Sequence, residues 1–60
     1  MSNILLNMII VFFLNDQVQQ EQYTCYKAEC DYIAEARTAQ IRKQGGNIEW
    51  IKFEELKNGG

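Results

Sequence analysis

Two cysteines are the side chains of this sequence with the clearest capacity for chemistry. Cys25 and Cys30 are its only thiols, and the 60-residue chain contains no histidine. A Cys-His nucleophile is therefore excluded, and two thiols without further ligands are too few for a zinc site. The sequence predicts no catalytic, metal or cofactor site, and the protein is not expected to be an enzyme.

Both cysteines fall in a segment whose composition predicts a helix. Five residues at about 100° each place Cys25 and Cys30 on different sides of a helix, so we expect no disulfide between them. Cys25 would lie in the first helical turn, where a thiol pKa is lowered, but a semi-buried structural role is the more common one. Cys30 is expected in the core. Two reduced thiols are typical of a reducing compartment, so a cytoplasmic location is expected.

Arg37 is predicted to lie near the middle of an apolar helix stripe, where its stem would pack on a sheet. Its guanidinium would then reach a carboxylate such as Glu49 or Glu21. A role as an interface anchor is the alternative, because arginine is enriched at binding hot spots. The stripe itself consists of Tyr26, Cys30, Ile33, Ala34 and Ile41.

An apolar run from Ile4 to Leu14 dominates the N-terminal part of the chain. It is apolar at even and odd positions alike, whereas a strand with one wet face alternates. A membrane span needs about 20 apolar residues, and a signal peptide begins with positive charge, which is absent before Lys27. We expect a buried strand over residues 5–14 and no membrane contact. A membrane-associated or secreted peptide is the alternative.

The next segments follow from turn and cap signals. Asn15-Asp16 predicts a two-residue hairpin into a polar edge strand over residues 17–23, with Phe13 opposite Val18 and Met8 opposite Tyr23. Residues 24–44 lack Gly and Pro and predict a helix, which Thr24 would cap and Gly45-Gly46 would end.

Residues 47–55 predict the last strand, followed by a flexible tail over residues 57–60. Its alternation places Ile48 and Trp50 on one face and Ile51 and Phe53 on the other.

These elements predict a single small α+β domain over residues 1–60. The order is ββαβ, with a three-stranded antiparallel sheet in the order 2-1-3 and one long helix on one face. A domain of this size buries only about 60% of the surface of its unfolded chain, and one helix leaves one sheet face bare. We therefore expect a homodimer, either sheet on sheet or edge to edge.

The candidate contact residues for the second copy or another partner are large or hot-spot side chains, with Trp50 foremost. They are Phe12, Phe13, Tyr32, Arg37, Trp50 and Phe53. The net charge of −2 and the scattered basic residues argue against a nucleic-acid partner.

Three segments carry a resemblance to known proteins: "IIVFFLNDQ", "YTCYKAECDYIAEARTAQIRKQGG" and "IEWIKFE". Together they resemble short single-domain accessory proteins of bacteriophages, many of which bind a host enzyme or an immune-defence protein and block it. The resemblance implies a non-catalytic inhibitor of a bacterial protein, acting in the host cytoplasm.

The terminal Gly59-Gly60 carries an alternative resemblance. It is similar to the end of β-grasp sulfur carriers and ubiquitin-like modifiers, which share an early hairpin and a single helix. That family places its final strand parallel to the first, whereas we expect an antiparallel strand here.

Overall fold

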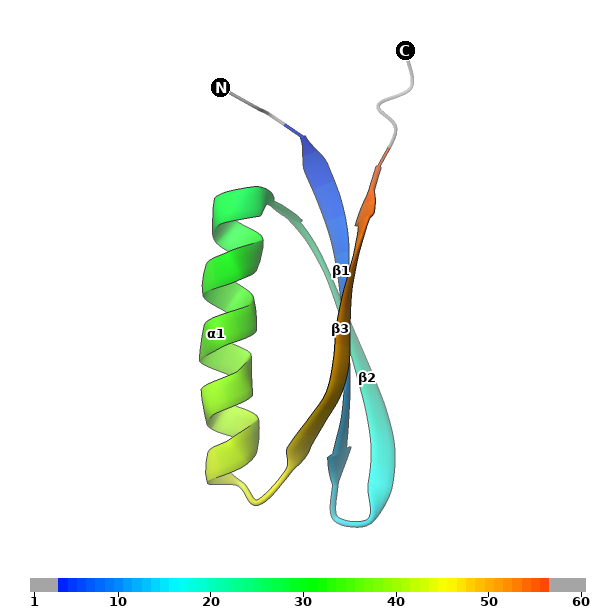
Figure 1. Cartoon of the computed structure of the whole chain (residues 1–60), viewed down its shortest axis with the longest axis vertical. Coiled ribbons are helices and arrows are strands. Elements are labelled where there is room, and N and C mark those ends of the chain that lie inside the picture. Colours follow the sequence, from blue (N-terminus) through cyan, green and yellow to red (C-terminus); the bar gives the residue numbers. More distant parts are fainter. Residues whose placement is uncertain (1–3, 57–60) are drawn as a thin grey trace.

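The computed structural model describes residues 4–56, which form three strands and one helix. The elements are β1 (Leu5–Leu14), β2 (Gln17–Tyr26), α1 (Lys27–Lys43) and β3 (Asn47–Glu55). β1 pairs antiparallel with both neighbours, in the order β2-β1-β3 (Figure 1). The predicted α+β fold with strand order 2-1-3 is confirmed. The tail over residues 57–60, with Gly59-Gly60, lies outside the described residues.

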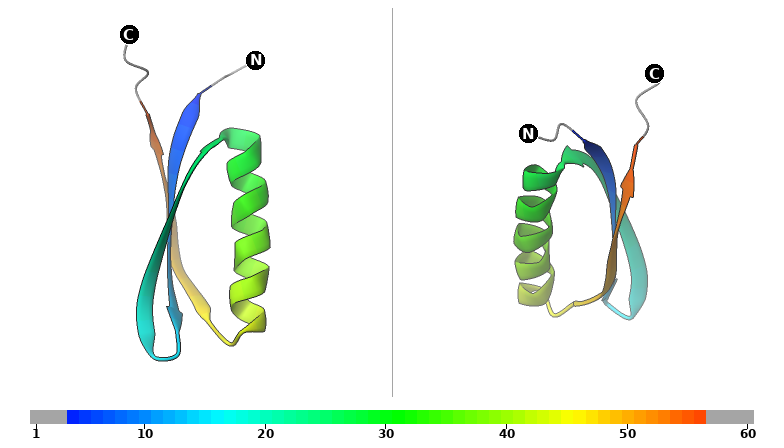
Figure 2. Two further views of the ribbon diagram at one scale, coloured as in Figure 1. Left: turned by 180° about the vertical axis from the view of Figure 1, so that it is seen from behind. Right: turned by 45° about the horizontal axis from the view of Figure 1, so that its top comes forward.

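The described part of the molecule has two layers, because α1 runs along one face of the sheet and no element of residues 4–56 covers the other face (Figure 2). The core lies between these layers. Even-numbered residues of β1 point toward α1, and Met8 and Ile10 are 0% exposed. They pack against Cys30 and Ile41 of the helix.

The hairpin between β1 and β2 forms as its turn residues predict. Asn15 and Asp16 have φ values of 54° and 61°, the left-handed region that a two-residue hairpin turn requires. The resulting register places Phe13 opposite Val18 and Met8 opposite Tyr23, as predicted.

The junction between β2 and α1 differs from the prediction. β2 continues to Tyr26 because Thr24 and Tyr26 pair with Asn7 and Leu5 of the long central strand. The helix begins at Lys27 rather than at residue 24, and Tyr26 takes the N-cap position in place of Thr24. Tyr26 is also 49% exposed, so it does not belong to the core stripe.

This junction contains a disulfide between Cys25 and Cys30, whose Cα atoms are 5.4 Å apart. The prediction that the two residues cannot bridge was wrong, because it assumed that both lie on one helix. Cys25 is the penultimate residue of β2 and Cys30 lies in the first turn of α1, so the chain can bring the two sulfurs together. Both residues are buried, at 3% and 0% exposed. The expectation of two reduced thiols therefore no longer supports a reducing compartment.

Gly45 and Gly46 end the helix as predicted. Gly45 has φ 90°, and the Gly45 and Gly46 N–H groups donate to the carbonyls of Arg42 and Ile41, a Schellman motif. A Cβ atom on Gly46 would lie 2.6 Å from the Phe13 carbonyl oxygen and 2.7 Å from Ile41 Cγ2. Gly46 thus permits the close approach of the helix end to β1.

A bulge in β3 corrects the predicted faces of that strand. Val11 pairs with Trp50 but Phe12 pairs with Ile48, so Glu49 is an extra residue. Ile48 consequently lies on the helix side with Ile51 and Phe53, and it does not share a face with Trp50. Trp50 lies on the opposite face of the sheet.

Candidate functional site

The sheet face opposite α1, hereafter the outer face, carries an uncovered cluster of apolar side chains. Phe13, Val18 and Trp50 are 40%, 60% and 49% exposed, and they surround Val11, which is 9% exposed. We call these four residues the outer-face patch.

The strand register makes the outer-face patch contiguous. Phe13 lies directly opposite Val18 on β2, and Val11 lies directly opposite Trp50 on β3. Directly opposed residues hold their Cβ atoms about 4.5–5.5 Å apart. Val11 and Phe13 are two residues apart on β1 and point to the same face. The patch therefore crosses all three strands at the hairpin end of the sheet.

The surroundings of the outer-face patch are polar but carry little net charge. Gln20, Gln22 and Thr24 of β2 pair with outer-face positions of β1. On β3, the outer-face residues Lys52 and Glu54 form an ion pair 3.6 Å long. The arrangement is an apolar centre with a neutral rim of hydrogen-bonding groups.

The predicted contact residues do not form one surface. Phe13 and Trp50 meet on the outer face. Phe12 is only 2% exposed, because its side chain points into the core beneath α1, so the prediction of Phe12 as a contact residue was wrong. Phe53 lies on the helix side of β3, and Tyr32 of α1 is 75% exposed.

Val11 and Val18 are patch residues that the sequence prediction missed. The signal for Val18 was present, since the hairpin register already placed it opposite Phe13. Val11 could not be assigned from the sequence, because nothing in the apolar run indicates which alternate residues face the helix.

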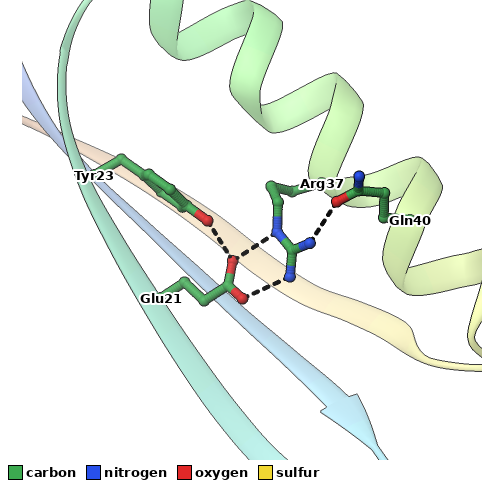
Figure 3. A network of polar contacts seen from close by, with 4 residues as sticks. All are labelled: Glu21, Tyr23, Arg37 and Gln40. Carbon is green, nitrogen blue, oxygen red and sulfur yellow. Dashed lines mark hydrogen bonds and ion pairs between the residues drawn. The ribbon is translucent and has the colours of Figure 1, made fainter.

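Arg37 forms the main polar contact between the two layers (Figure 3). Its Nε and Nη2 donate to the two carboxylate oxygens of Glu21, at 2.9 and 2.6 Å. Tyr23 Oη donates to Glu21 Oε1 at 2.8 Å, and Arg37 Nη1 donates to Gln40. Glu21 is one of the two carboxylates predicted for Arg37, so that contact is confirmed.

The electrostatics of this cluster favour a fixed ion pair over proton transfer. Hydrogen bonds from Arg37 hold the pKa of Glu21 below its ordinary value, although partial burial opposes this. The same bond to Glu21 raises the pKa of Arg37. Partial burial and the bond to Glu21 raise the pKa of Tyr23. All three groups therefore keep their ordinary charge states near neutral pH, and the cluster fastens α1 to β2.

Other features of residues 4–56 add no catalytic or metal-binding arrangement. Both cysteines are consumed by the disulfide, so no free thiol is available for nucleophilic chemistry. That part of the chain holds no group of three or more His, Cys, Asp or Glu side chains able to bind a metal.

Two shallow hollows lie near the start of α1. One, of about 490 Å³, is lined by Thr24, Cys25, Ala28, Glu29, Tyr32 and Ile33. The other, of about 360 Å³, is lined by Ile4, Leu6, Lys27, Phe53 and Glu55. Neither brings together side chains with a shared chemical role.

α1, the helix of the described region, is neither long nor apolar enough to cross a membrane. The apolar run at residues 5–14 is the central strand β1. β3 runs antiparallel to β1, which differs from the parallel final strand of β-grasp proteins.

Comparison of the chain with protein-family models, with curated protein sequences and with solved structures finds no match.

Proposed function

We propose that this protein acts by binding another protein, without catalysis, and that the outer-face patch is its contact surface. The observation that carries the proposal is the contiguous exposure of Phe13, Val18 and Trp50 on a face that no element within residues 4–56 covers. Clustered apolar exposure of this kind marks interaction surfaces on soluble proteins.

The energetic gain from covering the patch is substantial for so small a protein. Full burial of one large apolar side chain stabilises by about 1.5–3 kcal/mol. Because Phe13, Val18 and Trp50 are roughly half exposed, a partner would gain on the order of 1 kcal/mol from each. Trp50 is the strongest candidate for a hot spot, since tryptophan is enriched among residues that dominate binding energy.

The rim of the patch indicates the chemistry of the partner. Lys52 and Glu54 neutralise each other. The outer face therefore has no net charge that would select a strongly charged partner. Gln20 and Gln22 can hydrogen-bond to the edge of an interface. The partner surface is therefore apolar at its centre and uncharged, and we propose a bacterial protein that is inhibited stoichiometrically by a homodimer of this chain.

The disulfide bears on where this binding takes place. Disulfides persist in oxidising compartments and are rare in the cytosol. The Cys25–Cys30 bond thus favours action in an oxidising compartment over the host cytoplasm that the sequence suggested.

Affinity capture from a bacterial lysate tests the proposal with matched variants. Trp50→Ser removes the largest exposed side chain of the patch, and Tyr32→Ser removes an aromatic side chain that is 75% exposed on α1. We expect wild type and Tyr32→Ser to retain the same partner in a fixed stoichiometry and Trp50→Ser to lose it, with circular dichroism unchanged. Retention of that partner by Trp50→Ser would overturn the assignment of the surface.

A further inference from the structure

The outward edge of β2 is unpaired among the described residues. β2 lies at the edge of the sheet and pairs only with β1, so one side of its backbone is unpaired. Such an edge offers a row of N–H and C=O groups that can template pairing with another strand.

The hairpin register identifies which residues carry the unpaired groups. Leu14 and Gln17 flank the two-residue turn and form its hydrogen-bonded pair. Hydrogen-bonded and non-bonded pairs alternate along an antiparallel ladder. The backbone groups of Val18, Gln20, Gln22 and Thr24 therefore point away from β1.

The hydrogen bond of the Tyr26 N–H agrees with this alternation and marks where the unpaired part of the β2 edge ends. By the same alternation the Tyr26 N–H points outward, and it donates to Glu29 Oε1 of α1 at 3.1 Å. The chain thus satisfies this donor itself. The open part of the edge runs from Val18 to Thr24 and is centred on Glu21.

The two edge strands of the sheet differ in protection. β3 carries the bulge at Glu49 and several charged residues, which are common devices against edge pairing. β2 pairs with β1 through ten residues without a register shift, and it contains neither lysine nor proline. Its single charged residue, Glu21, is neutralised by Arg37. Of the two edge strands in the described sheet, β2 is therefore the one left open to another strand.

We propose that two copies of this chain join through the free edges of β2, forming one six-stranded antiparallel sheet. This inference rests on the homodimer of the proposed function and names its contact. A two-fold axis beside Glu21 places Val18 opposite Thr24 and Gln20 opposite Gln22 of the second copy, so every directly opposed pair along the open edge except that at Glu21 is uncharged.

The geometry and charge of the edge suit a second copy. The two Glu21 carboxylates would lie near the axis, but the bidentate contact with Arg37 removes most of their mutual repulsion. The helices of the two copies lie on the same face of the joined sheet. The two β1 strands would be three strand spacings apart, about 14 Å, which accommodates two helices of about 10–12 Å diameter. Both outer-face patches remain exposed on the opposite side.

Light scattering on four purified proteins tests this contact. Gln22→Pro removes an outward-pointing N–H and leaves the β1–β2 ladder bonded. Gln19→Lys adds a charge to the same edge on the helix side of the sheet, away from the outer-face patch, and serves as a second variant in case proline disturbs the fold. Trp50→Ser alters the outer face alone. We expect two chains per particle for wild type and Trp50→Ser, and one for both edge variants, with the circular dichroism of all four alike.

Three other outcomes would overturn the dimer through β2. They also distinguish a failure of this dimer contact from a failure of the proposed binding through the outer-face patch. If Trp50→Ser is monomeric while both edge variants stay dimeric, the dimer forms through the outer face. If all four proteins are dimeric, neither surface is the contact. If wild type is monomeric and only the edge variants lose a captured bacterial protein, β2 pairs with a strand of that protein. Loss of that captured protein by Trp50→Ser tests the proposed function independently of each result.

Discussion

Glu21 and Arg37 lie 16 residues apart in the sequence and meet in a bidentate ion pair between β2 and α1. The pair joins the polar edge strand to the helix beside Tyr23, which packs against the core. It also leaves the open edge of β2 without an unpaired charge. The same ion pair therefore stabilises the fold and neutralises the edge through which we propose that two copies join.

Breaking this ion pair is expected to destabilise the fold modestly. Both side chains are about a quarter exposed, so solvent screens the interaction, and Arg37→Ala should lower the free energy of unfolding by about 1 kcal/mol. Urea denaturation provides the measurement. As a control, Lys27→Ala breaks the exposed Lys27–Asp31 pair and should cost less than about 0.5 kcal/mol. Equal effects of the two substitutions would contradict the role given to Arg37.

The same pair predicts a loss of stability in acid. The folded-state pKa of Glu21 lies below its ordinary value of 4.5, so the unfolded chain takes up the proton first as the pH falls. The contribution of the ionised carboxylate is complete above that ordinary value and disappears as the pH falls through the folded-state pKa. The stability difference between wild type and Glu21→Gln should therefore shrink as the pH falls from neutral through 4.5 and then through the lower folded-state pKa of Glu21. A difference that is constant over this range would exclude the linkage.

Removing the disulfide is expected to cost more than removing the ion pair. Closing so short a loop stabilises by about 2 kcal/mol in the chain-entropy model. The variant Cys25→Ala/Cys30→Ala should show this loss in urea denaturation, and wild type in a dithiol reductant should show a similar one. Thiol titration of the unreduced protein in denaturant checks the bond itself, and two titratable thiols would contradict it.

Alanine substitution of the two adjacent glycines at the end of α1 is expected to destabilise the protein to different degrees. Gly46→Ala places a methyl group 2.6 Å from the Phe13 carbonyl oxygen and should destabilise by about 3 kcal/mol. Gly45→Ala meets no atom within 4 Å and has only its φ of 90° to oppose it, so it should cost about 1 kcal/mol. Thermal unfolding of the two variants gives the order, and the reverse order would show that the close approach to β1 relaxes easily.

Trp50 is the only tryptophan of the chain and reports directly on the outer face. Because it is 49% exposed and distant from the β2 edge, we expect acrylamide to quench its fluorescence equally in concentrated and dilute protein. Addition of a captured partner should reduce the quenching and shift the emission to shorter wavelength. Protection of Trp50 at high concentration of the protein alone would instead indicate that the outer face mediates self-association.

The sequence contained enough information for the fold because its strongest signals are local. Asn15-Asp16 and Gly45-Gly46 adopt the left-handed or closely packed conformations that few other residues allow, and they fix where the hairpin turns and where the helix ends. The helix start had no comparable signal. Thr24 and Cys25 suit a strand or a helix, and their pairing with β1 decided between the two.

The errors in the predicted site follow from that junction and from the bulge. Once the helix start was placed three residues early, Cys25 and Cys30 could not be predicted to bridge. The bulge at Glu49 has no marker in the sequence, yet it moves Ile48 to the helix side. Phe12 and Phe13 are equivalent in composition, and only packing against α1 distinguishes the buried residue from the exposed one.

The mass of the native protein in solution decides whether the chain self-associates, which both the proposed homodimer and its contact through β2 require. Light scattering across a wide range of concentrations should give the mass of two chains of 7.0 kDa each. A mass of 7.0 kDa at every concentration up to the solubility limit would contradict self-association.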